Sequence, residues 1–366
     1  MNSKTSSVRP TTALDMTRPL IFDGHNDLLL KLFRSGGLSA RGMFETGSDG
    51  HLDIAKAKSG GFAGGFFAVF VPSPMSEERD EEKMQNPPYD VPLPDPISWE
   101  DAVPVALSQA AILLKLEEDG LLRIVRASGD IETAMTEGRI AAILHMEGAE
   151  AIDPEFETLH VLYAAGLRSL GPVWSRPTIF GHGVPFRFPS DGDTGPGLTD
   201  HGLRLVRRCN EMGIMIDLSH LNEAGFWDVA RHSTKPLVAT HSNANAVTAS
   251  ARNLTDKQLA AIAETDGMVG LNFATAFLRE DGRMDEDTPL ETMIRHLDHL
   301  LEKLGEDRVG LGSDFDGAKV PSEIKDVSGL PNLRTAMRTH GYDEQLIEKI
   351  CNRNWIRVLR SSWNEQ

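Results

Sequence analysis

Eight short runs of apolar or β-branched residues alternate along the chain with polar and helical stretches, and this alternation constrains the fold more than any other feature. The runs lie at residues 20–25, 66–71, 140–147, 169–174, 214–220, 237–241, 268–273 and 309–314. Between most of them, apolar residues recur three and four apart, which predicts helices at 102–118, 202–212, 255–264 and 288–304. Alternating strands and helices favour parallel pairing. Eight such units predict a closed (β/α)8 TIM barrel rather than an open doubly wound sheet.

The barrel is predicted to occupy residues 20–366 as a single catalytic domain, preceded by a polar lead-in at 1–19 that is disordered or extended. Two stretches interrupt the alternation. Residues 72–98 are rich in proline and charge and are expected to form a surface excursion. Residues 175–199, rich in glycine and proline, follow the fourth strand and are expected to form an active-site wall or lid. A short ninth run at 121–125 is predicted to be an accessory strand, and residues 342–363 a helical cap.

The composition indicates a small partner. With 37 Lys and Arg against 54 Asp and Glu, the net charge of -17 disfavours a nucleic acid or an anionic membrane as partner. The strongest apolar stretches are strand-length, well short of the roughly 20 residues of a membrane helix. Only two cysteines occur, Cys209 and Cys351, which favours a reducing compartment. We therefore expect a cytoplasmic protein that acts on a small molecule.

Side chains that commonly bind metals stand at the ends of five of the predicted strands. They are His25, Asp27, Glu147, His220, His241 and Asp314. Because the C-terminal ends of barrel strands meet at one mouth, these groups are expected to converge there. Imidazoles and carboxylates without thiolate favour Zn²⁺, and five or six ligands suffice for two ions if one carboxylate bridges them. Two such ions can lower the pKa of a shared water and polarise a substrate carbonyl.

Each of these residues also has a structural interpretation, because a lone histidine at a strand end is more often a hydrogen-bonding residue than a ligand. Asp217 and Asp316 lie near strand ends as well. Asp217 stands three residues from His220 and so faces the other way along a strand, which indicates a supporting or structural role. His145 shares a face with Glu147 and is either a polar core residue or part of the pocket.

Two loop residues have equally open roles. His182 lies in the loop at 175–199 and either contacts the substrate or is a surface histidine. Arg252 follows the sixth strand by eleven residues, and either grips a carboxylate with its guanidinium or is solvated.

Five motifs in this order give the chain a specific resemblance. They are FDGHNDL, HMEGAEAID, GIMIDLSHLN, THSNANAV followed by SARNLTD, and GLGSDFDG. Between residues 22 and 359 the chain resembles the renal-type or membrane dipeptidases, zinc enzymes of the metallopeptidase M19 group with an amidohydrolase-like barrel. The resemblance implies that His25 and Asp27 bind a first zinc and that Glu147 bridges it to a second zinc, which His220 and His241 bind. It further implies that Asp314 handles a proton and that Arg252 grips the C-terminal carboxylate of the substrate.

The chain departs from the family at two positions. Animal members place a histidine after the fourth strand that helps to bind the substrate and the tetrahedral intermediate, and the matching residue here is Trp174. Either His182 takes over this task or the metals suffice. His145 stands where relatives often carry a small residue. Trp174, His182 and His145 are therefore predicted as further substrate-binding residues.

The resemblance implies a binuclear zinc dipeptidase that hydrolyses dipeptides with a free C-terminal carboxylate and tolerates a D-residue at that end. It also implies a possible homodimer. Two alternatives stay open: another metallohydrolase on this fold, such as a deaminase or lactonase, and a binding protein on the same fold without catalysis.

Overall fold

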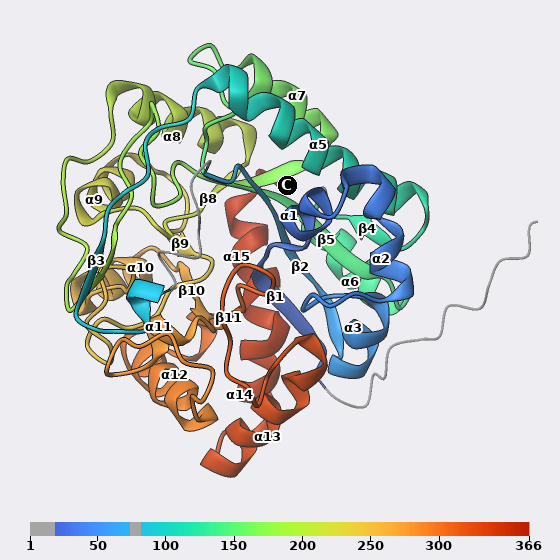
Figure 1. Cartoon of the computed structure of the whole chain (residues 1–366), viewed down its shortest axis with the longest axis vertical. Helices are drawn as coiled ribbons and strands as arrows, with labels where there is room; N and C mark the ends of the chain where they lie inside the picture. Colours follow the sequence, from blue (N-terminus) through green and yellow to red (C-terminus); the bar gives the residue numbers. More distant parts are fainter. Residues whose placement is uncertain (1–18, 74–81, 366) are drawn as a thin grey trace, which may run out of the picture.

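Eight parallel strands form a barrel in the described part of the chain, which comprises residues 19–73 and 82–365 of this computed structural model (Figure 1). The strands are β1 (Ile21–Asn26), β2 (Phe62–Phe70), β5 (Ile140–Glu147), β6 (Leu167–Gly171), β8 (Met215–Ile216), β9 (Val238–Ala239), β10 (Met268–Asn272) and β11 (Val309–Gly312). Their order is β8-β6-β5-β2-β1-β11-β10-β9. The backbone N–H of Leu218, just after β8, donates to Val238 O of β9 at 2.8 Å and joins the two ends of the sheet. The predicted (β/α)8 barrel is confirmed.

Helices surround the barrel (Figure 1). They are α1 (Leu28–Arg34), α2 (Gly42–Thr46), α3 (Ile54–Gly60), α5 (Trp99–Glu118), α6 (Ser128–Thr136), α7 (Glu157–Ala165), α8 (Asp200–Met212), α9 (Glu223–His232), α10 (Asp256–Glu264), α11 (Thr275–Leu278), α12 (Leu290–Leu304), α13 (Leu330–His340), α14 (Glu344–Glu348) and α15 (Asn354–Ser362). The four predicted helices are present. The first begins earlier than its apolar pattern, because Ser98 caps it by accepting a hydrogen bond from the N–H of Asp101 at 3.2 Å.

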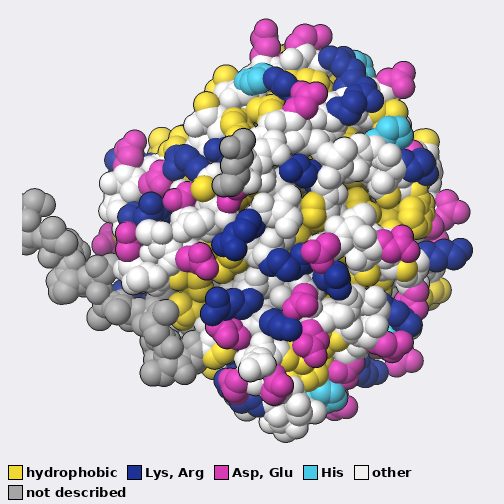
Figure 2. Space-filling model, turned by 180° about the vertical axis from the view of Figure 1, so that it is seen from behind, with side chains coloured by type: hydrophobic (Ala, Val, Ile, Leu, Met, Phe, Trp, Pro, Cys, Tyr) yellow, Lys and Arg dark blue, Asp and Glu magenta, His cyan; other side chains and the backbone are white. Residues whose placement is uncertain are grey.

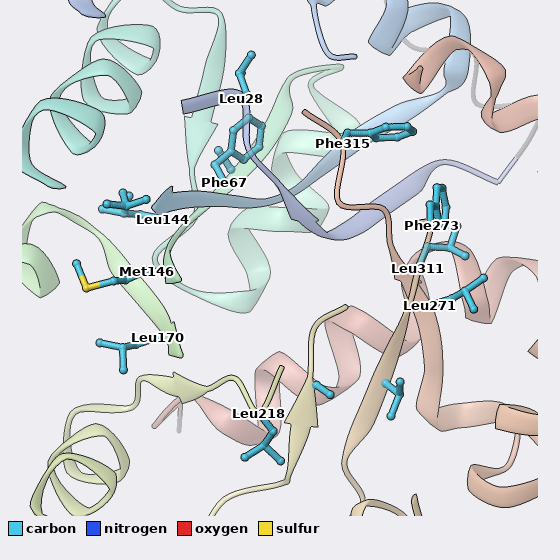
Figure 3. Packing of buried hydrophobic residues seen from close by; sticks show 14 of the residues in the cluster. Leu28, Phe67, Leu144, Met146, Leu170, Leu218, Leu271, Phe273, Leu311 and Phe315 are labelled. Atoms are coloured by element: carbon cyan, nitrogen blue, oxygen red, sulfur yellow. The ribbon is translucent and has the colours of Figure 1, made fainter. Parts of the chain in front are cut away.

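The larger hydrophobic core lies between the strands and the helices (Figure 3). A second cluster fills the barrel interior, where Trp355 of α15 inserts from the end opposite the strand C-termini. Its indole N–H donates to Leu311 O at 3.0 Å. Gly24 and Gly310 lie against its ring, because a Cβ at either position would collide with it. The C-terminal helical segment thus closes the end of the barrel that lies opposite the strand C-termini.

Three strands are shorter than their apolar runs. The predicted runs at 169–174, 214–220 and 237–241 contribute only β6, β8 and β9. His220 has φ +67° and Asp314 has φ +62°, a left-handed backbone that leaves the extended conformation. The side chains of His220 and Asp314 therefore sit in turns immediately beyond the strands, whereas His25 and Glu147 lie within β1 and β5. By contrast, β2 begins four residues before its predicted run, since Gly64 lets it approach the backbone of Ala141.

The stretches at 72–98 and 175–199 meet each other. β3 (Tyr89–Val91) pairs antiparallel with β7 (Phe186–Phe188). Tyr89 and Val91 are buried, and Met84 is buried with them. The other residues at 82–98 are mostly exposed, so this part of 72–98 runs along the surface while these apolar residues pack against the other loop. The lead-in at 1–18 and residues 74–81 lie outside the described residues.

The accessory strand is confirmed: β4 (Leu122–Ile124) pairs with β5 outside the barrel order. Figure 2 shows acidic and basic side chains interspersed over the face that it displays. Across the described ranges, no helix has the length and apolar character needed to span a bilayer.

Candidate active site

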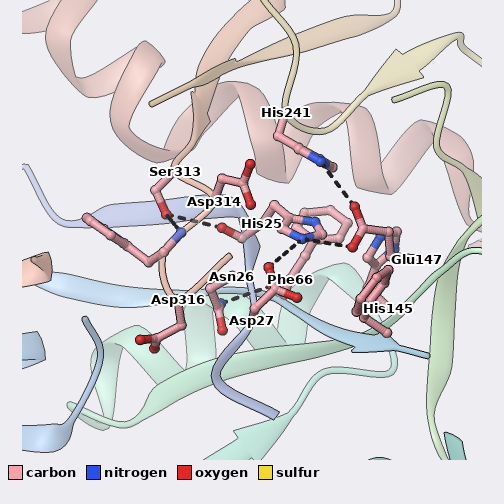
Figure 4. Close-up of polar contacts among 12 residues, drawn as sticks. His25, Asn26, Asp27, Phe66, His145, Glu147, His241, Ser313, Asp314 and Asp316 are labelled. Carbon is pink, nitrogen blue, oxygen red and sulfur yellow. Dashed lines mark hydrogen bonds and ion pairs between the residues drawn. The ribbon is translucent and has the colours of Figure 1, made fainter. Parts of the chain in front are cut away.

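Two neighbouring barrel strands, β1 and β11, bring His25, Asp27 and Asp314 together (Figure 4). His25 is the last residue but one of β1. Asp27 follows directly after that strand and immediately precedes α1. The end of β1 is tied to the end of β11, because the N–H of Asp27 donates to Phe315 O at 2.7 Å and the N–H of Asp314 donates to His25 O at 3.0 Å. This pairing holds His25, Asp27 and Asp314 together, and their ligand atoms lie within 4.8 Å of one another.

Glu147 occupies the centre of the site, and its two carboxylate oxygens face different partners. Oε1 lies 3.0 Å from His220 Nε2 and 3.3 Å from His241 Nε2. Oε2 lies 3.6 Å from His25 Nε2, which is itself 3.2 Å from Asp27 Oδ2. The carboxylate thus stands between one pair, His25 with Asp27, and a second pair, His220 with His241. This is the geometry that a bridging ligand between two ions requires.

Hydrogen bonds behind the second pair fix which ring nitrogen faces the site. The Thr240 hydroxyl donates to Asp217 Oδ2 at 2.6 Å, so it accepts from Nδ1 of His241 at 2.8 Å. Nε2 of His241 therefore carries a lone pair directed into the site. Nδ1 of His220 is likewise engaged by Ser175 Oγ at 3.1 Å. Asp217 acts here through Thr240, in the supporting role expected from its position.

Burial shifts the pKa values of these groups in opposite directions. It raises the pKa of Glu147 well above its ordinary value and lowers those of His220 and His241 well below theirs. For His25, burial also opposes the charge, but the carboxylates of Glu147 and Asp27 outweigh it and raise the pKa to about 10. Burial therefore favours the neutral forms of Glu147, His220 and His241 in the protein without an added positive charge.

A divalent cation fits this arrangement. Nε2 of His220 and Nε2 of His241 lie 3.2 Å apart, and both face Glu147 Oε1. Lone pairs that converge on a carboxylate repel one another unless a positive charge lies between them. The donors comprise imidazole and carboxylate without a thiolate, which is the usual ligand set of catalytic zinc.

Asp314 lies at the edge of the first pair. Its Oδ2 accepts a hydrogen bond from the Asn272 side chain at 3.0 Å. Burial raises its pKa, and the nearby charge of His25 opposes that shift. Gly317 lies against Oδ1 of Asp314 and Oδ2 of Asp27, where a Cβ would collide with both oxygens. Asp314 therefore has one oxygen held by Asn272 and one directed toward the first pair.

Arg252 is buried beside the second pair. Its guanidinium donates to His241 O at 3.0 Å and to Ser242 Oγ at 3.1 Å, and it lies 5.8 Å from the ring centre of Phe277. Its Nε–H is buried without an acceptor among the described residues. Burial lowers the pKa of Arg252 to about 10, which leaves the group charged at neutral pH. The guanidinium is thus held beside the second pair, with one of its donors left without an acceptor among the described residues.

A cavity of about 580 Å³ opens above these groups. Asp27, Glu147, His220 and Asp314 line its floor. An apolar wall, formed by Phe70, Met84, Trp174, Phe186 and Phe277, rises beside His220. A polar side, which includes Lys31, Asp49, His51 and Lys319, lies toward α1. The volume suits a ligand of a few residues.

Three predicted substrate-binding residues do not line this cavity: Arg252, His145 and His182. His145 is fully buried behind the site, with Nδ1 2.9 Å from Ser169 Oγ and its ring edge toward His25. Its packing is that of a polar core residue, the structural interpretation of its position. His182 is half-buried and has Nδ1 3.2 Å from Gly197 O. Trp174, by contrast, lies in the wall.

Sequence reasoning missed several residues that shape the site. Thr240 directly precedes His241, and Asn272 ends its strand, so both had a positional signal at the barrel mouth. Met84 lies in the stretch at 72–98, Phe186 in the short strand β7 and Phe277 in the short helix α11, where no periodicity marks a pocket residue.

The fold and the site define a barrel metallohydrolase, with imidazoles and carboxylates gathered at the C-terminal ends of parallel strands. Residues 12–365 match the membrane dipeptidase family, peptidase family M19, and the chain belongs to this family. It is a metallopeptidase, a hydrolase of peptide bonds.

Two solved structures and one further relative are similar to this chain over most of its length. A metallopeptidase from Rhodobacter sphaeroides, liganded with a phosphinate mimic of the dipeptide L-Ala-D-Ala, is 55% identical with a TM-score of 0.93, over 94% of this chain and 100% of that one. The metallopeptidase called dipeptidase AC is 56% identical with a TM-score of 0.92, over 94% and 99% of the two chains. A Klebsiella pneumoniae protein from the pqqA 5′ region is 48% identical over 267 residues, which are 72% of this chain and 98% of that protein.

Proposed function

We propose that the protein is a binuclear zinc dipeptidase that hydrolyses dipeptides with a free C-terminal carboxylate and accepts a D-residue at that end. The observation that carries the proposal is that the two carboxylate oxygens of Glu147 face different partners. Oε1 faces His220 and His241, and Oε2 faces His25. The family and the small cavity support a dipeptide substrate. The dipeptide mimic bound by the Rhodobacter sphaeroides relative supports a D-residue at the C-terminal end.

His25 and Asp27 would hold one ion, His220 and His241 the other, and Glu147 both. Bound there, two divalent ions supply an activated water and polarise the scissile carbonyl. Arg252 anchors the substrate carboxylate through the N–H that has no acceptor within the described chain. This contact fixes the peptide bond over the floor of the cavity.

Asp314 moves the proton in this proposal. Asn272 holds its Oδ2, and burial raises its pKa, so the carboxyl group can take a proton from the attacking water and hold it. It then gives the proton to the leaving amine, whose C–N bond breaks. The apolar wall limits the access of bulk water to this transfer.

Free, buried thiols at Cys209 and Cys351 are compatible with a reducing compartment, and we place the protein in the cytoplasm. A homodimer stays a prediction.

A dipeptide library with L- and D-residues at each position, assayed with added Zn²⁺, tests the proposal. Hydrolysis that includes D-residues at the C-terminal end, and that chelation abolishes, is the expected result. Full activity after complete metal removal would contradict the proposal, and so would the absence of dipeptide hydrolysis in zinc-loaded protein.

The rival function, deamination or lactone hydrolysis on the same site, differs in its anchor. Arg252→Ala is expected to raise KM for dipeptides by about 10- to 100-fold, because a charged hydrogen bond is worth about 1.5–3 kcal/mol. The same variant should leave KM unchanged for the corresponding dipeptide amide, which lacks the carboxylate. An equal effect on both substrates would favour the rival.

A further inference from the structure

Trp174 differs from the other tryptophans in how its indole N–H is used. The chain has five tryptophans. Four of them donate the indole N–H to a protein oxygen at 3.0–3.3 Å: Trp99 to Ala151 O and Thr158 Oγ1, Trp227 to Glu223 Oε1, Trp355 to Leu311 O, and Trp363 to Arg168 O. Within the described ranges, the indole N–H of Trp174 has no hydrogen-bond acceptor. Its nitrogen is not one of the fully buried polar atoms without a partner, so the N–H is not enclosed by the protein.

The Trp174 ring is nevertheless held firmly. It packs edge-on against Phe70, with ring centres 5.1 Å apart, and against Phe186 at 5.7 Å. Beneath it lies the fully buried guanidinium of Arg176, 5.5 Å from the ring centre. Arg176 is itself fixed by hydrogen bonds to Glu150 Oε1 at 2.8 Å and Val71 O at 2.5 Å. The ring is thus positioned by packing, while its donor stays unused.

The ring also lies at the reacting end of the cavity. Trp174 lines the same cavity as Glu147 and His220, and its ring centre is 5.8 Å from that of His220. An indole N–H is a donor that cannot accept, so it suits an acceptor that gains negative charge. Of the two residues that could replace the family histidine as a donor, His182 does not line the cavity, whereas Trp174 does and lies beside His220.

We propose that the indole N–H of Trp174 donates a hydrogen bond to the oxygen of the scissile carbonyl as that oxygen becomes negatively charged. This inference rests on the dipeptidase function proposed above. When water adds to the carbonyl carbon, the C=O π electrons move onto the oxygen, and the N–H holds this charge without giving up its proton. A donor in place before the reaction stabilises the transition state more than the bound substrate.

The first test compares Trp174→Phe, which removes the donor but keeps an aromatic ring, with Trp174→His, which keeps a ring N–H. Trp99→Phe is the matched control, because Trp99 also donates its N–H but lies outside the cavity. Trp174→Phe is expected to lower kcat for L-Ala-D-Ala by about 10²-fold with KM within about threefold, and to weaken a phosphinate mimic of that dipeptide by a similar factor. Trp174→His should recover most of the loss. Zinc content is measured for each variant.

Two results would overturn the inference: kcat of Trp174→Phe within twofold of the natural protein, or equal losses in Trp174→Phe and Trp174→His at full zinc content. The outcome is separable from the proposed function. Failure of the unsubstituted protein to hydrolyse dipeptides contradicts the dipeptidase, whereas hydrolysis that ignores Trp174→Phe contradicts only the role of Trp174.

A second measurement does not depend on how the variants fold. In ¹H–¹⁵N spectra of the zinc-loaded protein, the phosphinate mimic should move the indole N–H resonance of Trp174 strongly downfield, with much smaller changes at the other four indoles. An unmoved Trp174 resonance at saturating mimic would contradict the hydrogen bond.

Discussion

The floor and the wall of the cavity are built in different ways. The floor side chains come from strands or from the turns directly after them. They are Asp27, Glu147, His220 and Asp314, and His25 and His241 contact Glu147 at 3.6 and 3.3 Å. Hydrogen bonds from behind fix several of these groups, as Thr240 does for His241 and Asn272 for Asp314. The wall side chains are apolar or aromatic, come largely from short elements and loops outside the barrel, and are held by ring packing such as Trp174 against Phe186. This difference indicates that the floor carries the ligand and proton-transfer groups, whereas the wall, apart from the indole N–H of Trp174, shapes and desolvates the substrate site.

The largest effect is expected from Glu147→Gln. The amide keeps the shape but loses the charge that both pairs face, so both ions should bind weakly. We expect kcat/KM to fall by at least about 10³-fold, because metal-ion catalysis supplies several kcal/mol. Zinc content by mass spectrometry should fall in parallel. Glu155→Gln, on the surface, is the control, and normal zinc content with normal activity in Glu147→Gln would remove the distinction between floor and wall.

Thr240→Val tests whether the floor depends on its support from behind. The methyl group replaces the hydroxyl that links Asp217 to His241, so the His241 ring loses its fixed orientation. A loss of about 10- to 100-fold in zinc affinity is expected for one of two ions, with the other unchanged. Competition with a chelator measures both affinities. An equal loss at both sites, or no loss, would contradict the assignment of His241 to one ion only.

Phe186→Ala tests the wall. The ring lies 5.7 Å from Phe277 and 6.3 Å from His220, and its loss enlarges the cavity without touching a floor residue's hydrogen bonds. We expect KM for dipeptides with apolar side chains to rise by about tenfold at nearly constant kcat, because the ring contributes equally in the ground and transition states. Steady-state kinetics decide this. A fall in kcat with unchanged KM would contradict this and would assign Phe186 itself a part in the chemistry.

The smallest effect is expected on stability at acidic pH. It involves His296, which contacts the helix α11 that carries Phe277 of the wall. Buried His296 accepts the N–H of Ala244 at 3.2 Å and contacts Leu278 O at 3.0 Å, and burial lowers its pKa to about 4. The unfolded chain binds this proton near pH 6.5, so stability is present above 6.5 and falls as the pH drops toward 4.

Between pH 7 and pH 5 His296 should therefore account for about 2 kcal/mol of lost unfolding free energy. Urea unfolding of the natural protein and of His296→Gln, at both pH values, measures this. The variant should lose less between the two pH values. Equal losses would show that His296 is not held neutral in the folded protein.

The sequence was more informative about the floor than about the wall. Strand periodicity placed Glu147 at the last residue of β5, and the alternation of strands and helices placed the other ligand-type residues at the same mouth. Local periodicity does not extend to contacts between distant loops. The pairing of β3 with β7 joins residues about a hundred positions apart, and Met84, which is buried in the same cluster, contributes to the wall.

The apolar pattern of the sequence also did not predict where the strands end. His220 and Asp314 stand at the end of apolar runs, but their left-handed backbone, set by hydrogen bonds to neighbouring strands and loops, places them in turns. Burial of His145 behind His25 depends likewise on how β5 and β6 pair, at His145 and Ser169. Periodicity assigns a face to such residues but does not distinguish the cavity from the core beneath it.

The central claim is that Glu147 joins two ions, each held by one pair of ligands. A crystal structure of the zinc-loaded protein, with anomalous scattering recorded at the zinc edge, tests it most directly. Two peaks are predicted, one beside His25, Asp27 and Glu147 Oε2, the other beside His220, His241 and Glu147 Oε1. A single peak at full zinc loading, or His25 and Asp27 on different ions, would contradict the claim.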